Sequence, residues 1–344
     1  MHIDNYNDAI MNCRFCFMCR HLSAIGNVTF TEADTPRVRA AMTYGIKTGT
    51  HRLDDPDFIE TVYRADLSAC CRHLCVNHFD EAGLLLALRA DIVEAGLAPA
   101  PVAALAKSLS ASASWKISAG KEPVAYFEDR ATAAAKTVAP AFAKLAKKAG
   151  VSYRTIKGGC IGHALAVLGY RDDAKAALGA FAAFLQKTGV GTLVVSNPAA
   201  LKFLVADAPE LGVKIPCKVV HSSEFIAGLK LAYKPAGALY PLADDFLRNY
   251  LDVDPATKLM KQLKAEAKPF GTNDEETYCC GEGALVLDEL HPELVAKLAA
   301  YVAARADDPA KDVLAVASPY VRRVLASAGL KARTFEEIAA GALA

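Results

Sequence analysis

Two successive stretches of this chain alternate short apolar runs with longer helical patterns. In the first stretch, extended runs at residues 124–127, 151–156 and 191–196 are separated by helical patterns at 131–150 and 173–188. Short strands between long helices indicate βαβ units and a mainly parallel sheet. A further extended run, Lys218–His221, follows and predicts another strand.

The same order recurs from about Ala238. An extended start is followed by a helix through Leu263, a helix at 292–306 and an apolar run at 312–319. This recurrence predicts an internal duplication. We therefore expect an α/β fold in which residues 113–236 and 237–344 form two pseudo-repeated subdomains. Composition changes abruptly near residues 108–118, so residues 1–112 should form a separate N-terminal domain.

Composition narrows the function classes. The 344 residues are 53% apolar and 22% charged, which is typical of a folded chain rather than a disordered one. Lys and Arg number 39 against 38 Asp and Glu, so no net field steers the protein towards nucleic acid.

Targeting and membrane signals are not evident in the sequence. Residues 1–13 lack the basic and apolar segments of a secretory signal. The most apolar stretch, residues 84–100, contains Arg89, Asp91 and Glu94, and so predicts an amphipathic helix rather than a membrane span. We expect the chain in the cytoplasm, either free or held at the inner face of the membrane by a partner.

The N-terminal cysteines are spaced like the ligands of an iron–sulfur cluster. Two residues separate Cys13 from Cys16, and two separate Cys16 from Cys19. In two-cluster ferredoxins, the fourth cysteine of each run binds the other cluster. That rule gives one complete ligand set and one incomplete set. The complete set is Cys13, Cys16, Cys19 and Cys75, and the incomplete set is Ser23, Ala65, Ser68 and Cys71.

We therefore expect one 4Fe–4S cluster in a helical, ferredoxin-like N-terminal domain. Two other interpretations remain open: buried thiols that only pack in the core, and a tetrahedral zinc site. Cys70 or Cys71 could also replace Cys75 as the fourth ligand.

Several further motifs carry a resemblance to known proteins. They are Thr35-Pro-Arg-Val-Arg39, Leu88-Arg-Ala-Asp91 and Tyr278-Cys-Cys-Gly-Glu-Gly283. With the N-terminal cysteines, they resemble the iron–sulfur subunits of glycolate oxidase, anaerobic glycerol-3-phosphate dehydrogenase and lactate-utilisation complexes. Those proteins join a two-cluster ferredoxin module to paired cysteine-rich CCG domains, which also occur in the heterodisulfide reductase B subunit.

The resemblance implies that each half once held a leading cysteine, an adjacent pair and a closing C-x2-C. In the first half these positions read Glu128-Asp129, Gly159-Cys160 and Asn197-Pro-Ala-Ala200. In the second half they read Ala243-Asp244-Asp245, Cys279-Cys280 and Ala317-Ser-Pro-Tyr320. The remaining thiols Cys160, Cys279 and Cys280 should line a relic pocket. A second interpretation is that they meet across the pseudo-twofold axis, with Asp244 or His163, to bind a metal.

The function implied is electron transfer within a flavin-dependent dehydrogenase or demethylase complex. The partner flavoprotein would carry FAD or FMN and oxidise a 2-hydroxy acid, a glycerol phosphate or an N-methylated amine. Electrons would leave to electron-transfer flavoprotein or to a quinone-linked acceptor. Gly281-Glu-Gly283 is not a dinucleotide fingerprint, because position 286 is valine. The chain itself should therefore bind no flavin.

Two alternatives belong to other classes. One is a structural or docking subunit whose single metal centre only stabilises the N-terminal domain. The other is a thiol–disulfide reductase that uses Cys279 and Cys280. Low-pKa thiols need cationic neighbours, whereas Glu275, Glu276 and Glu282 surround this pair, which argues against the reductase.

Overall fold

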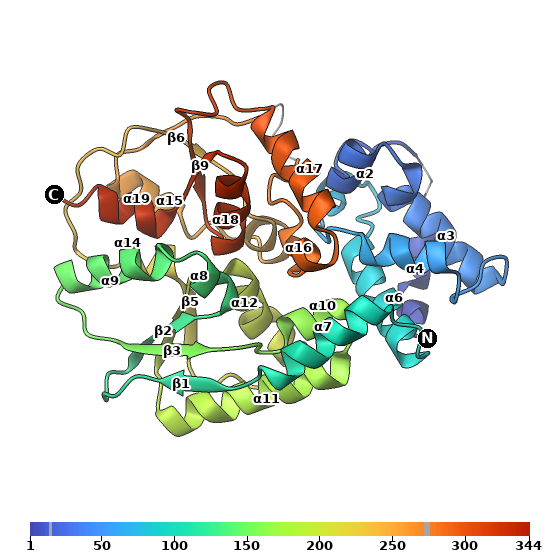
Figure 1. Ribbon diagram of the computed structural model, residues 1–344, viewed down its shortest axis with the longest axis horizontal. Coiled ribbons are helices and arrows are strands. Elements are labelled where there is room, and N and C mark those ends of the chain that lie inside the picture. Colours follow the sequence, from blue (N-terminus) through green and yellow to red (C-terminus); the bar gives the residue numbers. More distant parts are fainter. Residues whose placement is uncertain (14–15, 272–275) are drawn as a thin grey trace.

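The protein is a mixed α/β fold with a helical N-terminal part and two mainly parallel sheets (Figure 1). The computed structural model describes residues 1–13, 16–271 and 276–344, without the side chains of His73 and Leu74. Glu275 lies outside the described residues, so its expected place beside Cys279 and Cys280 is not described.

The first sheet has the strand order β1-β3-β2-β4-β5, in which only β1 is antiparallel to its neighbour. Its strands are β1 (Trp115–Ile117), β2 (Val124–Glu128), β3 (Arg154–Gly158), β4 (Thr192–Val195) and β5 (Lys218–His221). The strand expected at 151–156 begins later, at Arg154. Val151 instead closes the preceding helix, because its N–H donates to the Ala146 carbonyl after Gly150 has turned to a positive φ.

The second sheet has the order β7-β6-β8-β9, and all its strands are parallel. Its strands are β6 (Ala238–Pro241), β7 (Glu266–Ala267), β8 (Val313–Val316) and β9 (Lys331–Thr334). This order repeats β3-β2-β4-β5 of the first sheet strand for strand, as an internal duplication predicts. The expected α/β class is confirmed.

Helices cover the sheets and build the N-terminal part. The N-terminal helices are α1 (Asn7–Asn12), α2 (Ala24–Thr29), α3 (Pro36–Thr48), α4 (Pro56–Tyr63), α5 (Cys71–Leu74), α6 (Glu81–Glu94) and α7 (Ala100–Ala111). Those of the first half are α8 (Arg130–Ala134), α9 (Val138–Lys148), α10 (His163–Leu168), α11 (Arg171–Thr188), α12 (Pro198–Lys202), α13 (Ala208–Glu210) and α14 (Ser222–Ala227). Those of the second half are α15 (Thr257–Gln262), α16 (Leu287–Leu290), α17 (Pro292–Ala303), α18 (Pro319–Ser327) and α19 (Phe335–Gly341).

Two helix predictions need correction. The single helix expected at 131–150 is two helices, α8 and α9, because Pro140 is tolerated only in a first turn and α9 begins just before it. Helix α6, expected to be amphipathic, is buried on nearly all sides. Its Arg89 donates to the carbonyl oxygens of Val62, Ala65 and Val167, which satisfies the charge inside the protein. In the described part of the chain, no helix has the length and apolar character to cross a bilayer.

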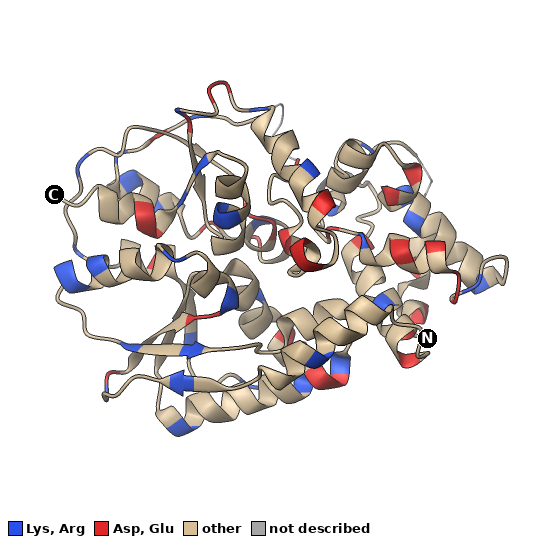
Figure 2. Ribbon diagram, viewed as in Figure 1, with Lys and Arg blue, Asp and Glu red and all other residues tan. Residues whose placement is uncertain are grey.

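The cores join the three parts of the molecule. One apolar core runs through both sheets and includes Val194, Leu239 and Ala315. A second joins the N-terminal helices to α10, through Leu85 and Leu165. Helix α17 packs beside α2 (Figure 1). Lys and Arg are interspersed with Asp and Glu over all three parts (Figure 2).

Candidate functional site

The structure brings two distant cysteine segments together. Cys13 follows α1 and Cys75 follows α5, and both pack against the same N-terminal core. The side-chain amide of Asn77 donates to the carbonyl oxygen of Asn12 at 2.5 Å. Cys75 is therefore held beside the segment that begins the Cys13-x2-Cys16-x2-Cys19 run.

The loop that carries Cys16 and Cys19 is anchored to α3. The guanidinium of Arg37 lies 4.3 Å from the ring centroid of Phe17, in the middle of the loop. Cys16 is exposed, whereas Cys19 is half-buried. Burial raises the pKa of Cys19 to about 11, the backbone N–H of Arg37 lowers it, and the nearby thiols of Cys13 and Cys16 raise it. The three thiols thus share one neighbourhood.

These four cysteines supply the donor type of a four-iron cluster, and the first three have its spacing along the sequence. Among the described residues, no three of them have their sulfur atoms within 4.8 Å of one another. Arg14 and Phe15, inside this loop, lie outside the described residues.

The incomplete ligand set surrounds a buried ionic network. Ser23 donates to the backbone oxygen of Asp34 at 2.6 Å, and Cys71 donates to the carboxylate of Glu81 at 3.6 Å. Glu81 accepts from Arg39 at 2.7 Å. The pKa of Arg39 is raised despite burial, by Glu81 first and then by Asp66 and Asp34. Hydrogen bonds and ion pairs occupy this region of the N-terminal domain.

The two possible substitutes for Cys75 face different ways. Cys70 accepts hydrogen bonds from Asn249 at 3.3 Å and from Arg248 at 3.6 Å, so it faces the second half of the molecule. Cys71 lies close enough to Cys19 for that thiol to raise its pKa, after the larger effects of burial and of Glu81. Of the two, Cys71 is the one on the side of the cysteine loop.

The strand ends of the first half are closed by protein groups. Asp129 accepts a hydrogen bond from the side-chain amide of Asn197 at 2.6 Å. Cys160 is buried and accepts from the N–H of Gly162 at 3.3 Å. A Cβ atom on Gly159 would lie 2.0 Å from the backbone oxygen of Ser112. The end of α7 therefore fills the space that a side chain at position 159 would need.

The strand ends of the second half form a cluster of ligand-type atoms. Asp244, Cys279 and Glu282 are all buried and each offers an atom within 4.8 Å of the other two. Burial raises the pKa of all three side chains, and Asp244 raises that of Glu282 further. The two carboxyl groups face each other: a hydrogen bond between them lowers the pKa of Asp244 and raises that of Glu282, and the Ser318 side chain lowers the pKa of Glu282. No other partner for either oxygen of Glu282 or for Oδ2 of Asp244 lies among the described residues.

The three thiols expected to line one relic site have different surroundings from one another. Cys279 belongs to the cluster with Asp244 and Glu282, and its thiol donates to the carbonyl oxygen of Ala243 at 3.3 Å. Cys280 adopts a positive φ of 52°. Among the described residues, Cys160 and Cys280 do not join the group around Cys279. In the sequence, Glu282 is evident only as a charged neighbour of Cys279 and Cys280, although an acid within a glycine-flanked turn is a signal that can identify a ligand.

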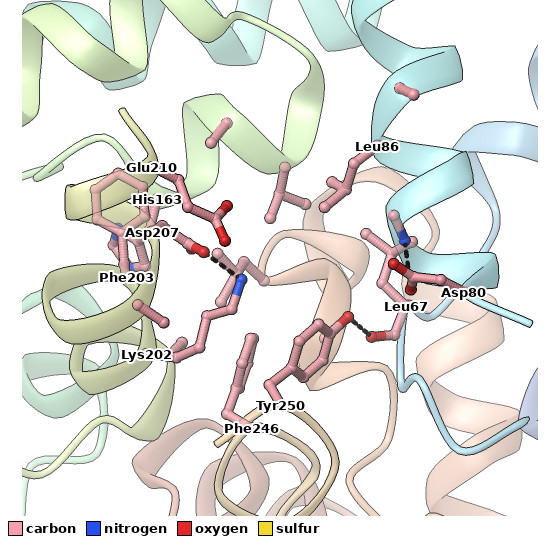
Figure 3. A pocket seen from close by; sticks show the side chains of 18 of the residues that line it. Leu67, Asp80, Leu86, His163, Lys202, Phe203, Asp207, Glu210, Phe246 and Tyr250 are labelled. Atoms are coloured by element: carbon pink, nitrogen blue, oxygen red, sulfur yellow. Dashed lines mark hydrogen bonds and ion pairs between the residues drawn. The ribbon is translucent and has the colours of Figure 1, made fainter. Parts of the chain in front are cut away.

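Two cavities adjoin these positions. One, of about 280 Å³, lies between the halves and is lined by Asp129 and Cys160 on one side and by Glu282 on the other. The other, of about 660 Å³, lies where all three parts of the molecule meet (Figure 3). His163 lines both cavities, and burial lowers its pKa to about 4.

Two charged side chains of the larger cavity pair with each other. Lys202 points towards Asp207, with an N–O distance of 2.6 Å, and lies 4.8 Å from the ring centroid of Tyr250 (Figure 3). The Tyr250 hydroxyl donates to the carbonyl oxygen of Leu67 at 2.6 Å. These contacts link the N-terminal part to both halves.

No family model, curated protein or solved structure matches the chain. The resemblance to iron–sulfur subunits with CCG domains therefore rests on the motifs of the chain itself.

Proposed function

We propose that this chain binds one 4Fe–4S cluster through Cys13, Cys16, Cys19 and Cys75, and that it transfers electrons for a partner flavoprotein. The observation that carries the proposal is the convergence of the two cysteine segments, fixed by the hydrogen bond between Asn77 and Asn12. Four thiols from two such segments match the donor set of a cubane.

The surface around these cysteines supports a role in docking. Met11, Phe17, Met18 and Val76 are large apolar side chains, each at least half exposed, within the two joined segments. Exposed apolar side chains gathered in one place mark interaction sites. A partner that covered them would lie close to the exposed Cys16.

Within such a complex, the four cysteines would hold a cluster that supplies one-electron transfer, whereas hydride chemistry would belong to the FAD or FMN of the partner. The N–H of Arg37 would help to set the potential, because hydrogen bonds to cluster sulfurs raise it. The electrons would leave to electron-transfer flavoprotein or to a quinone-linked acceptor, as the resemblance implies.

A structural role is the second candidate. The incomplete ligand set, now built around Arg39 and Glu81, interrupts the two-step relay of two-cluster ferredoxins. A single cluster could then serve only to hold the N-terminal segments together.

The first experiment measures iron and acid-labile sulfide in the anaerobically purified full chain, with the EPR spectrum after reduction by dithionite. We expect about four irons per chain and one cubane signal. Both should be lost in Cys16→Ser and in Cys75→Ser, and both should persist in Cys70→Ser, the matched control whose thiol faces Asn249. Loss of the iron and of the cubane signal in Cys71→Ser but not in Cys75→Ser would identify Cys71 as the fourth ligand. Zinc without sulfide would contradict the proposal.

Electron exchange separates the two candidates. The relay is supported if photoreduced FMN reduces the cluster and a quinone analogue then reoxidises it. A cluster that remains oxidised in the presence of reduced FMN, but whose loss unfolds the N-terminal domain, supports the structural role.

A further inference from the structure

The cluster formed by Asp244, Cys279 and Glu282 destabilises the fold when no ion is bound to it. Glu282 is 1% exposed and Asp244 is 6% exposed, so water cannot solvate their carboxyl groups. Buried carboxyl groups without hydrogen-bond partners are strongly destabilising, and two side by side repel each other once ionised. Apart from the contact between the two carboxyl groups and that of Glu282 with Ser318, three carboxylate oxygens in this group have no partner among the described residues.

Two basic side chains, Arg248 and His221, lie near these acids. Arg248 contacts the thiol of Cys70 and the side chain of Asn249. His221 is close enough to Asp244 for that carboxylate to raise its pKa, although burial lowers the pKa more. The Nε2 atom of His221 has no partner among the described residues, and it lies outside the group of three. A bound cation would neutralise the cluster.

The donor atoms select the class of cation. Carboxylate oxygens alone would suit magnesium or calcium, whereas a thiolate favours zinc and other divalent transition metals. One thiol with two carboxylates, all within 4.8 Å of one another, is the donor spacing of a single ion. Glu282 also lines the 280 Å³ cavity between the halves, so one of the three side chains adjoins an open space.

We infer that Asp244, Cys279 and Glu282 bind one divalent transition-metal ion, with zinc as the first candidate. Binding removes the thiol proton of Cys279 and leaves both carboxyl groups ionised, so three anionic ligands face one dication. This site is separate from the N-terminal cysteines. Zinc is counted apart from iron and sulfide, so the inference can fail while the proposed electron transfer stands, and the reverse.

The experiment titrates zinc alone into the chelator-treated full chain, with a chromophoric competitor to report affinity. We expect one zinc per chain at this site and roughly 100-fold weaker binding, or more, in Asp244→Asn and Glu282→Gln. Cobalt in place of zinc should give a thiolate-to-cobalt absorption band that Cys279→Ser removes. Cys160→Ser is the matched control, because it is the surviving thiol of the pseudo-equivalent position and should bind as the wild type does.

Glu282→Gln keeps the size of the side chain, and circular dichroism identifies any variant that fails to fold. Zinc that survives in folded Glu282→Gln but disappears in Cys16→Ser would place the ion at the N-terminal cysteines and overturn the inference. A wild-type chain that binds no zinc at micromolar concentration would overturn it as well.

Discussion

The two halves share a strand order but treat the ends of their strands in opposite ways. In the first half, Asn197 donates to Asp129, and the backbone of Ser112 fills the space beside Gly159. In the second half, Asp244 and Glu282 face each other beside Cys279, and apart from each other and Ser318, three of their oxygens have no partner in the described chain. The same scaffold is therefore closed by protein groups on one side and left with ligand-type groups on the other.

This difference shows in which half neighbouring protein groups compensate for a lost ligand position. An amide that donates to a buried carboxylate satisfies it with no ion present. A second carboxyl group in the same place can do so only in its protonated form, because its ionised form adds a like charge. The contrast is visible in the segments that stand in place of the closing C-x2-C motif. Asn197 and Ser318 both cap the helix that follows, but only Asn197 also donates to the aspartate at the leading position of its half, Asp129.

The largest expected effect tests whether the first half is closed by the backbone. Gly159→Ala would place a Cβ atom 2.0 Å from the Ser112 oxygen, so α7 must shift. We expect the free energy of unfolding, measured by urea denaturation, to fall by about 3 kcal/mol or more.

The control for this variant is Gly179→Ala in α11, where an added Cβ meets nothing within 4 Å. That change should be neutral or stabilise the helix by up to about 1 kcal/mol. Equal effects of the two substitutions would mean that the space beside residue 159 is not filled in solution.

The next effect tests compensation by hydrogen bonding. Asn197→Leu leaves the buried carboxylate of Asp129 without its amide donor and also removes the cap of α12. We expect a loss of about 2 kcal/mol in the free energy of unfolding, whether zinc is present or not. Ser318→Ala, the matched change in the second half, removes the cap of α18 and the contact of Ser318 with Glu282, and should cost about 1 kcal/mol. A zinc-dependent effect of Asn197→Leu would break the distinction between the halves.

The sequence predicted the α/β class because periodicity and strand length are local properties. Lys218–His221 was predicted within its bounds, whereas the strand at 151–156 was shifted because the end of α9 extends to Val151. The role of Glu282 could not be predicted in the same way. It depends on which groups face the carboxylate across the fold, and Asp244 comes from a different strand end.

The same limit applies to Gly159. Its place beside Cys160 was evident in the sequence, but the approach of Ser112 depends on how α7 docks onto the first sheet. Spacing alone predicts candidate ligands, whereas burial and partners decide which of them lack compensation.

The smallest expected effect is a stabilisation in the second half, opposite in sign to the loss expected for Asn197→Leu in the first half. In chelator-treated protein, Glu282→Gln supplies an amide that can donate to Asp244, as Asn197 does to Asp129. We therefore expect the variant to be more stable than the wild type by about 1 kcal/mol, measured by urea denaturation in the absence of metal. Added zinc should stabilise the wild type and not the variant, and so reduce or reverse this difference.

The matched control makes the same chemical change at an acid that has partners. Glu276 accepts from the hydroxyl groups of Tyr278 and Tyr301, and its carboxylate lies 3.4 Å from Arg305. Glu276→Gln should therefore cost about 1 kcal/mol, with or without zinc. A loss of similar size in metal-free Glu282→Gln would mean that Glu282 has a compensating partner within the protein, and the two halves would then differ in side chains but not in principle.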